Sequence, residues 1–209
     1  MKNGWLFAEN KEYVYLLTET KPTIMKKWLI GSLVGAILLF CWQFLSWTVI
    51  QLHEAEALYT PNQDSILTYL SGALKKEGTY MLPTVAPGSP MEEMEALGKK
   101  MDGNPWATVT YRQSYSHDMI RPMIRGFLVD LFIVFCLIYI LTRGGTPPTL
   151  RVIAGSVATG LITFLYGPYT QHNWFQTPLA DLYGHLTDAV VAWGLVGIWL
   201  GWWLNKRKA

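Results

Sequence analysis

An uncharged run of 23 residues, from Trp28 to Ile50, places the strongest limit on how this chain folds. At a rise of about 1.5 Å per residue it forms a helix of roughly 34 Å, long enough to cross a hydrocarbon core about 30 Å thick. Three further apolar blocks follow, within residues 125–142, 152–169 and 182–204. The blocks predict an all-α membrane protein, a bundle of four transmembrane helices.

The four blocks divide the chain into spans and connecting segments. The predicted transmembrane helices are residues 27–50, 125–142, 152–169 and 182–204. The remaining segments are residues 1–26, 51–124, 143–151, 170–181 and 205–209. An even number of spans returns the chain to the side of the membrane on which it began.

Lysine and arginine are distributed unevenly over these segments. They occur before the first span, in the 143–151 loop (Arg143 and Arg151) and after the last span, whereas residues 170–181 contain none. Short cytoplasmic segments carry an excess of positive charge, and long loops count for little in this rule. We therefore expect both termini in the cytoplasm and residues 51–124 outside it.

The first span has an alternative interpretation as a signal peptide. Met25-Lys26-Lys27 precedes the apolar run as in a signal sequence, and Ala55-Glu56-Ala57 loosely fits a cleavage site. The run is longer than the usual apolar core of about 7–15 residues, so an uncleaved anchor is expected. Because Met25 also resembles a natural start, residues 1–24 are either a cytoplasmic extension or the product of an upstream start.

Composition excludes several classes of protein. The chain is 51% hydrophobic and 15% charged, with a net charge of +2. Disordered chains and nucleic-acid-binding domains need more charge, and the latter need clustered basic residues. The two cysteines, Cys41 and Cys136, both lie in predicted spans, so no disulfide framework is expected. Membrane lipids, and not nucleic acids, are the expected surroundings.

The long segment 51–124 is expected to form a small, mainly helical cap. Apolar periodicity predicts a helix over residues 62–76, and Ser89-Pro90 is typical of the start of a second helix, capped by Ser89, that ends near Met101. Thr79–Leu82 and Trp106–Arg112 are strand-like and could pair as a short ribbon.

One dense polar patch precedes the second span. Two interpretations are open: an anion or lipid-headgroup site, or a solvated collar whose basic side chains extend to the membrane interface. We favour the collar. The patch consists of Arg112, His117, Asp118, Arg121 and Arg125.

Ionisable residues within the spans indicate a polar pocket that opens to the outside, because charge inside a membrane is costly and commonly functional. Asp181, His185 and Asp188 share one helix face through their spacing of four and three. Asp130 lies at a similar depth. The predicted pocket consists of Asp130, His185, Asp188, Asp181, Gln43 and Tyr166.

Three roles for this pocket compete. In the first, Asp188 or Asp181 binds His185 and the cluster only pins helices together. In the second, Asp130 carries a proton or ion and His185 tunes it. The third is a metal or haem site, which usually needs more histidine or cysteine, and His53 and His172 fall only at the interface. We favour the structural role and expect no metal and no cofactor.

Small residues recur at helix-packing spacings, which allow helices to approach closely. They offer either internal packing or a surface for another membrane protein. The glycines concerned are Gly31, Gly35, Gly194, Gly197 and Gly201, and Trp199 lies beside them on the last span.

Two motifs carry a resemblance to a known family. Gly31-Ser-Leu-Val-Gly35 leads into Cys41-Trp-Gln-Phe-Leu-Ser-Trp47, and Tyr183-Gly-His185 leads into the last span. In these motifs the chain resembles a small bacterial four-span inner-membrane family with no assigned activity. The resemblance implies the topology and a bacterial inner membrane, and the insertion 51–124 departs from the family pattern.

The sequence contains no nucleophile–base set and no cofactor motif, so we expect a non-catalytic accessory or assembly subunit of a larger membrane complex. Other integral membrane subunits are the expected partners. The alternative is a small oligomeric transporter or proton-coupled carrier that uses Asp130, His185 and Asp188. A third class, a lipid-modifying enzyme with His117 and Asp118 as acid and base, ranks last.

Overall fold

The protein divides into two compact units. A computed structural model describes the backbone of residues 5–206 and the side chains of residues 24–206. The first unit, the helical unit, comprises the described residues up to Leu58 and from Met119 onward. The second, the inserted unit, is Tyr59–Asp118.

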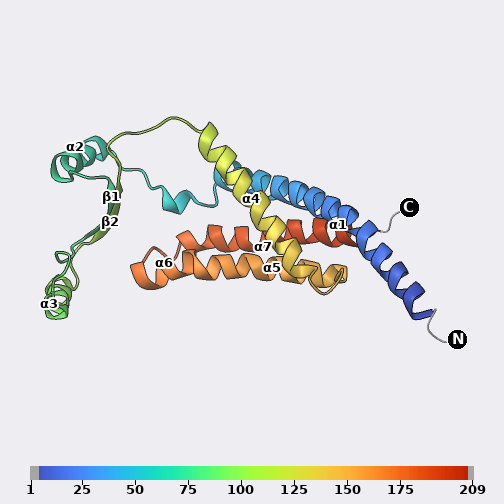
Figure 1. Ribbon diagram of the computed structural model, residues 1–209. Helices are drawn as coiled ribbons and strands as arrows, with labels where there is room; N and C mark the ends of the chain where they lie inside the picture. The colour runs from blue at the N-terminus through green and yellow to red at the C-terminus, as the bar shows by residue number, and fades with distance from the viewer. Residues whose placement is uncertain (1–4, 207–209) are drawn as a thin grey trace. The chain divides into compact units, whose positions relative to one another are not determined.

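The helical unit contains four helices that are long and apolar enough to cross a membrane, as the sequence predicted. Figure 1 shows them as the long ribbons of the molecule. They are α1 (Trp5–Phe44), extended by a π-helical turn (Leu45–Val49); α4 (Ile120–Leu141); α5 (Thr149–Tyr166), followed by α6 (Pro168–Phe175); and α7 (Asp181–Asn205).

Helix boundaries differ from the predicted ones in three places. Helix α1 already begins at Trp5, and the apolar span that it forms with the π-helical turn is Ile24–Val49. Helix α4 begins at Ile120 instead of residue 125. The predicted 170–181 loop contains most of α6, because Gly167 breaks the preceding helix and Pro168 starts a new one at its first position.

Helix α7 is central to the unit. It packs against α1 and α5, while α4 packs against α1 and makes few contacts with α5. The core where α1, α4 and α7 meet includes Leu39, Val134, Ile138, Val196 and Leu200, all buried. All four spans therefore contribute to one apolar core, α5 through the buried Val152, and α5 packs mainly against α7.

Close approach of α5 to α7 depends on glycine. A Cβ atom on Gly160 would overlap the carbonyl oxygen of Ala189 and lie 2.5 Å from Cδ1 of Trp193. A Cβ on Gly197 would lie 2.9 Å from Cα of Ile153. Larger residues at these positions would separate the two helices.

The end of α7 and the start of the apolar part of α1 lie together. Lys27 Nζ donates to the carbonyl of Leu204 (2.6 Å), and Trp203 Nε1 donates to the carbonyl of Lys27 (2.8 Å). The loop before α5 joins them, since Asn205 Nδ2 donates to Pro147 (3.1 Å). We call this the terminal end of the helical unit.

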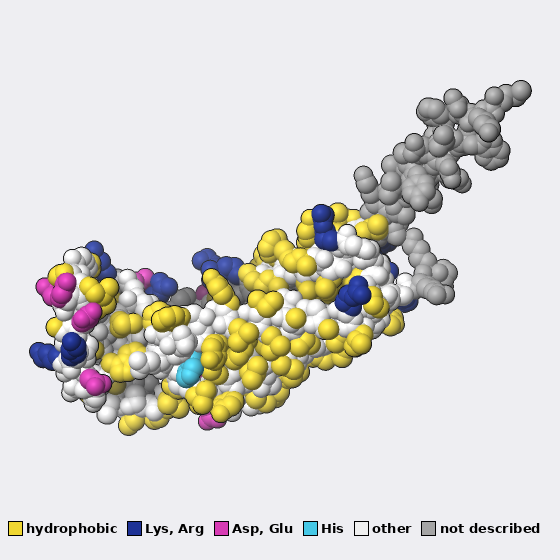
Figure 2. Space-filling model, turned by 90° about the horizontal axis from the view of Figure 1, so that it is seen from below, with side chains coloured by type: hydrophobic (Ala, Val, Ile, Leu, Met, Phe, Trp, Pro, Cys, Tyr) yellow, Lys and Arg dark blue, Asp and Glu magenta, His cyan; other side chains and the backbone are white. Residues whose placement is uncertain are grey.

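Much of the helical unit's surface is hydrophobic, as the face in Figure 2 shows. Exposed apolar side chains include Leu128, Phe132, Ile140, Ile162 and Ile198. Such a surface is costly in water and suits the hydrocarbon of a bilayer.

The inserted unit is built around a two-stranded ribbon. Strands β1 (Gly78–Leu82) and β2 (Ala107–Tyr111) pair antiparallel, as predicted. Helices α2 (Gln63–Ala73) and α3 (Met91–Met101) confirm the two predicted helices.

The expected capping of α3 by Ser89 is wrong. Pro90 occupies the N-cap position, and no side-chain cap bond is present there. Because the helix begins at Met91, Ser89 lies one residue too early to cap it.

Candidate functional site

The predicted intramembrane pocket separates into two groups of contacts. In the first, Gln43 Nε2 on α1 donates to Asp130 Oδ1 on α4 at 3.1 Å. Asp130 is buried, and its Oδ2 has no hydrogen-bond partner among the described residues. This pair links the last turn of α1 to α4 and does not include His185.

The second group surrounds Asp188 on α7. Its Oδ1 accepts hydrogen bonds from Trp42 Nε1 (2.8 Å), at the end of α1, and from Ser46 Oγ (2.7 Å), in the π-helical turn that follows. Its Oδ2 lies 2.9 Å from Nε2 of His53. Both carboxylate oxygens are therefore bonded, and the sequence had identified neither Trp42, Ser46 nor His53 as a partner.

A reversal of the chain after α1 brings His53 back to the helices. The π-helical turn Leu45–Val49 is followed by Gln51 in the left-handed region (φ 58°), and the Leu52 amide then donates to the carbonyl of Ser46 (2.9 Å). The next residue, His53, points into the protein and is 3% exposed.

Two neighbours fix the His53 ring. Trp47 stacks on it at a centroid separation of 4.0 Å and an interplanar angle of 3°. On the α7 side, a Cβ on Gly184 would lie 2.6 Å from the Leu52 carbonyl and 2.9 Å from Cε1 of His53. The loop can approach α7 only because residue 184 is glycine.

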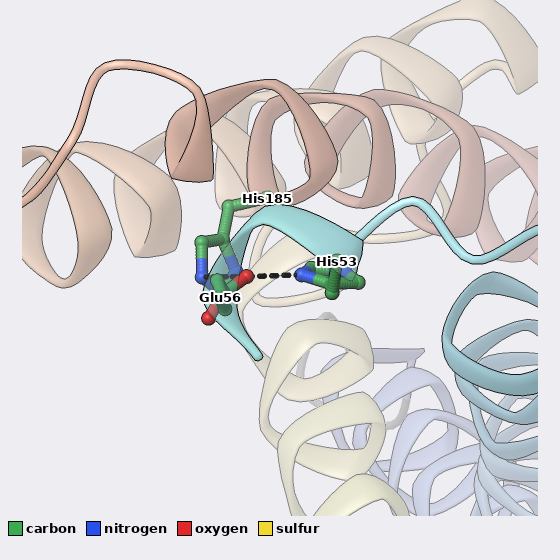
Figure 3. A group of neighbouring side chains, drawn as sticks. All are labelled: His53, Glu56 and His185. Carbon is green, nitrogen blue, oxygen red and sulfur yellow. Dashed lines mark hydrogen bonds and ion pairs between the residues drawn. The ribbon is translucent and has the colours of Figure 1, made fainter. Parts of the chain in front are cut away.

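Glu56 joins the two histidines. It belongs to a 3₁₀ turn, Glu54–Glu56, and its Oε1 lies 2.5 Å from Nδ1 of His53 and 3.2 Å from Nε2 of His185. The imidazole rings are 4.8 Å apart. Figure 3 shows all three side chains converging on one point from the loop and from α7.

The arrangement has one position for a cation or proton. Each nitrogen of His53 faces a carboxylate oxygen, but a neutral imidazole carries only one N–H. When Nε2–H donates to Asp188, the lone pair of Nδ1 faces Glu56. A proton or a metal ion between Nδ1 and Glu56 then satisfies both atoms.

Several predicted contacts of the pocket are wrong. Among the described residues, His185 forms its ion pair with Glu56, and no hydrogen bond or ion pair joins it to Asp181 or Asp188. Tyr166 is 86% exposed and lies outside both groups. One oxygen of Asp181 is buried without a hydrogen-bond partner among the described residues. Helical spacing placed Asp181, His185 and Asp188 on one face of α7, but the loop after α1 supplies the groups that contact His185 and Asp188.

The structure brings together what the sequence analysis had set apart. His53 was placed at the interface and Glu56 only in a cleavage-site pattern. Two local signals point to them: the His53-x-x-Glu56 spacing, and Trp42 with Ser46 at i and i+4 on the end of a span. Neither signal by itself indicates that His185 lies opposite.

The predicted polar patch is divided between the two units. Arg112, His117 and Asp118 belong to the inserted unit, where Arg112 Nη1 donates to Glu77 Oε2 at 3.1 Å. Arg121 and Arg125 lie in the first turns of α4.

Most of the small-residue positions serve internal packing. A Cβ on Gly31 would lie 3.1 Å from Ile138, one on Gly35 2.7 Å from Val134, and one on Gly201 2.8 Å from Thr149. Trp199 Nε1 donates to the Gly31 carbonyl (3.2 Å), and Gly197 packs on α5. Of this set, Gly194 alone has open space around it within the described residues.

No family model, curated protein or solved structure matches this chain. The resemblance to the small bacterial family therefore rests on the sequence motifs. The four apolar helices indicate a multi-pass membrane protein.

Proposed function

We propose that the protein is a non-catalytic accessory or assembly subunit of a larger complex in a bacterial inner membrane. The supporting observation is that the inserted unit leaves its apolar side chains uncovered. Leu67 on α2 and Met91 on α3 are 58% and 65% exposed, and neither helix contains a buried residue. A partner subunit would supply the surface that this unit lacks.

Energetics favour such a partner. An isolated two-stranded ribbon is marginally stable in water, and domains of about 60 residues depend on a sufficient core. The inserted unit, described throughout, has one buried hydrophobic residue, Tyr111. Its amphipathic helices therefore gain little by folding unless an apolar surface covers them.

Charge supports the proposed orientation. Lys27 lies at the terminal end, and Lys206 and Arg143 lie over Trp202 (4.7 Å) and Tyr139 (5.1 Å), an arrangement typical of a membrane interface. We place this end in the cytoplasm and the inserted unit outside it.

The test is the mass of the native protein, extracted in mild detergent from its own membranes and measured by native mass spectrometry. We expect other integral membrane proteins in fixed stoichiometry. Leu67→Glu should release them, because a charge on the α2 face cannot be buried without a partner charge. Asp64→Asn, on the same helix, is the matched control and should retain them. A native protein found only at its own mass would contradict the proposal.

A second candidate, a proton-coupled carrier, has the support of one observation. Asp130 is buried in a span, and among the described residues its carboxyl group has one hydrogen-bond partner, Gln43; an intramembrane carboxyl of this kind is a common proton carrier. In proteoliposomes, Asp130→Asn should abolish proton movement and leave the unfolding temperature nearly unchanged. Equal proton flux in the variant and the unaltered protein would remove this candidate.

A further inference from the structure

The two histidines and Glu56 offer a donor set that no part of the proposed function uses. One nitrogen of each histidine and a Glu56 carboxylate oxygen all lie within 4.8 Å of one another. Oε1 of Glu56 faces Nδ1 of His53 and Nε2 of His185. They come from two separate segments, the loop after α1 and the start of α7, and they converge within the helical unit.

We propose that His53, Glu56 and His185 bind a divalent transition-metal ion, with zinc as the best-fitting candidate. Two imidazole nitrogens and one carboxylate oxygen are a known set of three protein ligands for zinc, with water or another group in the fourth position. Magnesium and calcium prefer oxygen ligands only, so two nitrogens select against them.

The position of Asp188 fits a metal site. A metal-bound histidine almost always donates its other N–H to a carboxylate or carbonyl, which fixes the ring and its tautomer. His53 is held in this way: Nε2 faces Asp188 at 2.9 Å, and Nδ1 faces Glu56, the second proposed ligand. Trp42 and Ser46 bind the other oxygen of Asp188 and fix the carboxylate in turn.

The spacing of the donors needs two adjustments. Ligands about 2.0–2.1 Å from a tetrahedral zinc ion lie roughly 3.3 Å apart. The Glu56–His185 distance, 3.2 Å, already matches, whereas Glu56 lies 2.5 Å from His53 and the nitrogens of the two histidines are up to 4.8 Å apart. Because His53 is held on both sides, Glu56 must move away from His53 and His185 must move toward it. Both moving side chains are partly exposed, Glu56 at 23% and His185 at 30%.

Charge and access also favour a cation. Glu56 and Asp188 both contact His53, so two carboxylates surround one imidazole that is neutral when it binds metal. A divalent ion offsets their charge. The side chains of His185 and Glu56 are partly exposed, which leaves a route for the ion and for a water ligand.

Cobalt provides a direct test. The full chain, without an affinity tag, is purified in detergent, treated with a chelator and titrated with Co²⁺, whose visible absorption reports tetrahedral nitrogen and oxygen coordination. We expect one Co²⁺ per chain, displaced by equimolar Zn²⁺ and retained in millimolar Mg²⁺. An absence of saturable binding would overturn the proposal.

Matched variants locate the site. Glu56→Gln and His185→Asn should each weaken Co²⁺ binding by at least about 100-fold, and Asp188→Asn by about 10–100-fold. His172→Asn is the control and should bind Co²⁺ as the unaltered chain does. His172 lies on α6, contacts the carbonyl of Thr177 and is outside the proposed site. Circular dichroism and gel filtration verify folding. If His185→Asn does not fold, Co²⁺ binding by Glu56→Gln tests the proposed site. Undiminished binding by a folded Glu56→Gln or His185→Asn variant would overturn the proposal.

Discussion

The helical unit and the inserted unit differ in how much buried core each of them contains. In the helical unit, Val134, Ile138, Val196 and Leu200 from α4 and α7 are fully buried in one core. In the inserted unit, Tyr111 is the one buried hydrophobic side chain, and all of that unit is described. The first unit is therefore specified by its own contacts, and the second only by local ones.

Hydrogen bonds show the same contrast. In the helical unit they join distant segments, as between Trp42 on α1 and Asp188 on α7. In the inserted unit, side-chain bonds join the two strands of one ribbon, from Arg112 and Gln113 to Glu77 and Lys75. A protein with one self-sufficient unit and one incomplete unit suits a subunit that completes its fold on a partner.

The largest expected effect is a loss of stability in the helical unit, at the contact between α5 and α7. Gly160→Ala should lower the free energy of unfolding by about 3 kcal/mol or more, because the new methyl group meets the Ala189 backbone and a tryptophan ring. Gly194→Ala, on α7 with open space around it, should change it little. Thermal unfolding in detergent measures both. Equal stability of the two variants would contradict the α5–α7 packing described here.

A pair of leucines compares the two units directly. Leu200→Ala leaves a cavity in the buried core and should cost about 1–2 kcal/mol, less than in a water-soluble protein, because lipid is as apolar as the core. Leu67→Ala on α2 should cost less than about 0.5 kcal/mol in the isolated chain, since the side chain is already exposed. Denaturation monitored by tryptophan fluorescence gives both values. A larger loss for Leu67→Ala would show that α2 is covered within the chain itself.

The smallest expected effect is a pH dependence in the stability of the ribbon formed by β1 and β2. The Gln113 backbone N–H, and then Arg112, hold the pKa of Glu77 below its ordinary range. A lowered folded-state pKa adds stability above the unfolded pKa, about 4.3, and loses it as the pH falls through the folded value. Amide exchange across β1 and β2 should therefore quicken in acid, and Glu77→Gln should abolish this dependence. An unchanged acid response in Glu77→Gln would exclude Glu77 as the cause.

The sequence was sufficient for features that depend on local pattern. The apolar blocks predicted all four spans, and alternation predicted the pairing of β1 with β2. It was insufficient where distant segments meet. His185 and Asp188 were recognised on α7, but their partners lie in a loop that a π-helical turn and a left-handed Gln51 direct back to the helices. No periodicity encodes that reversal.

The glycines also show what the sequence pattern could not predict. Spacing indicated close helix packing, yet it did not show that Gly197 and Gly201 face α5 while Gly194 faces open space. Gly184 was assigned no role, and its missing side chain is what admits the Leu52 carbonyl and the His53 ring. Which neighbour a glycine meets is set by the three-dimensional arrangement of the helices.

Hydrogen–deuterium exchange tests the central claim, that the inserted unit is completed by a partner. Exchange is measured for the protein in its native membranes and for the purified chain in detergent. The account predicts that α2 and α3 are protected in the membranes and exchange rapidly in the purified chain, while α7 stays protected in both. Equal protection of α2 and α3 in the two samples would contradict it.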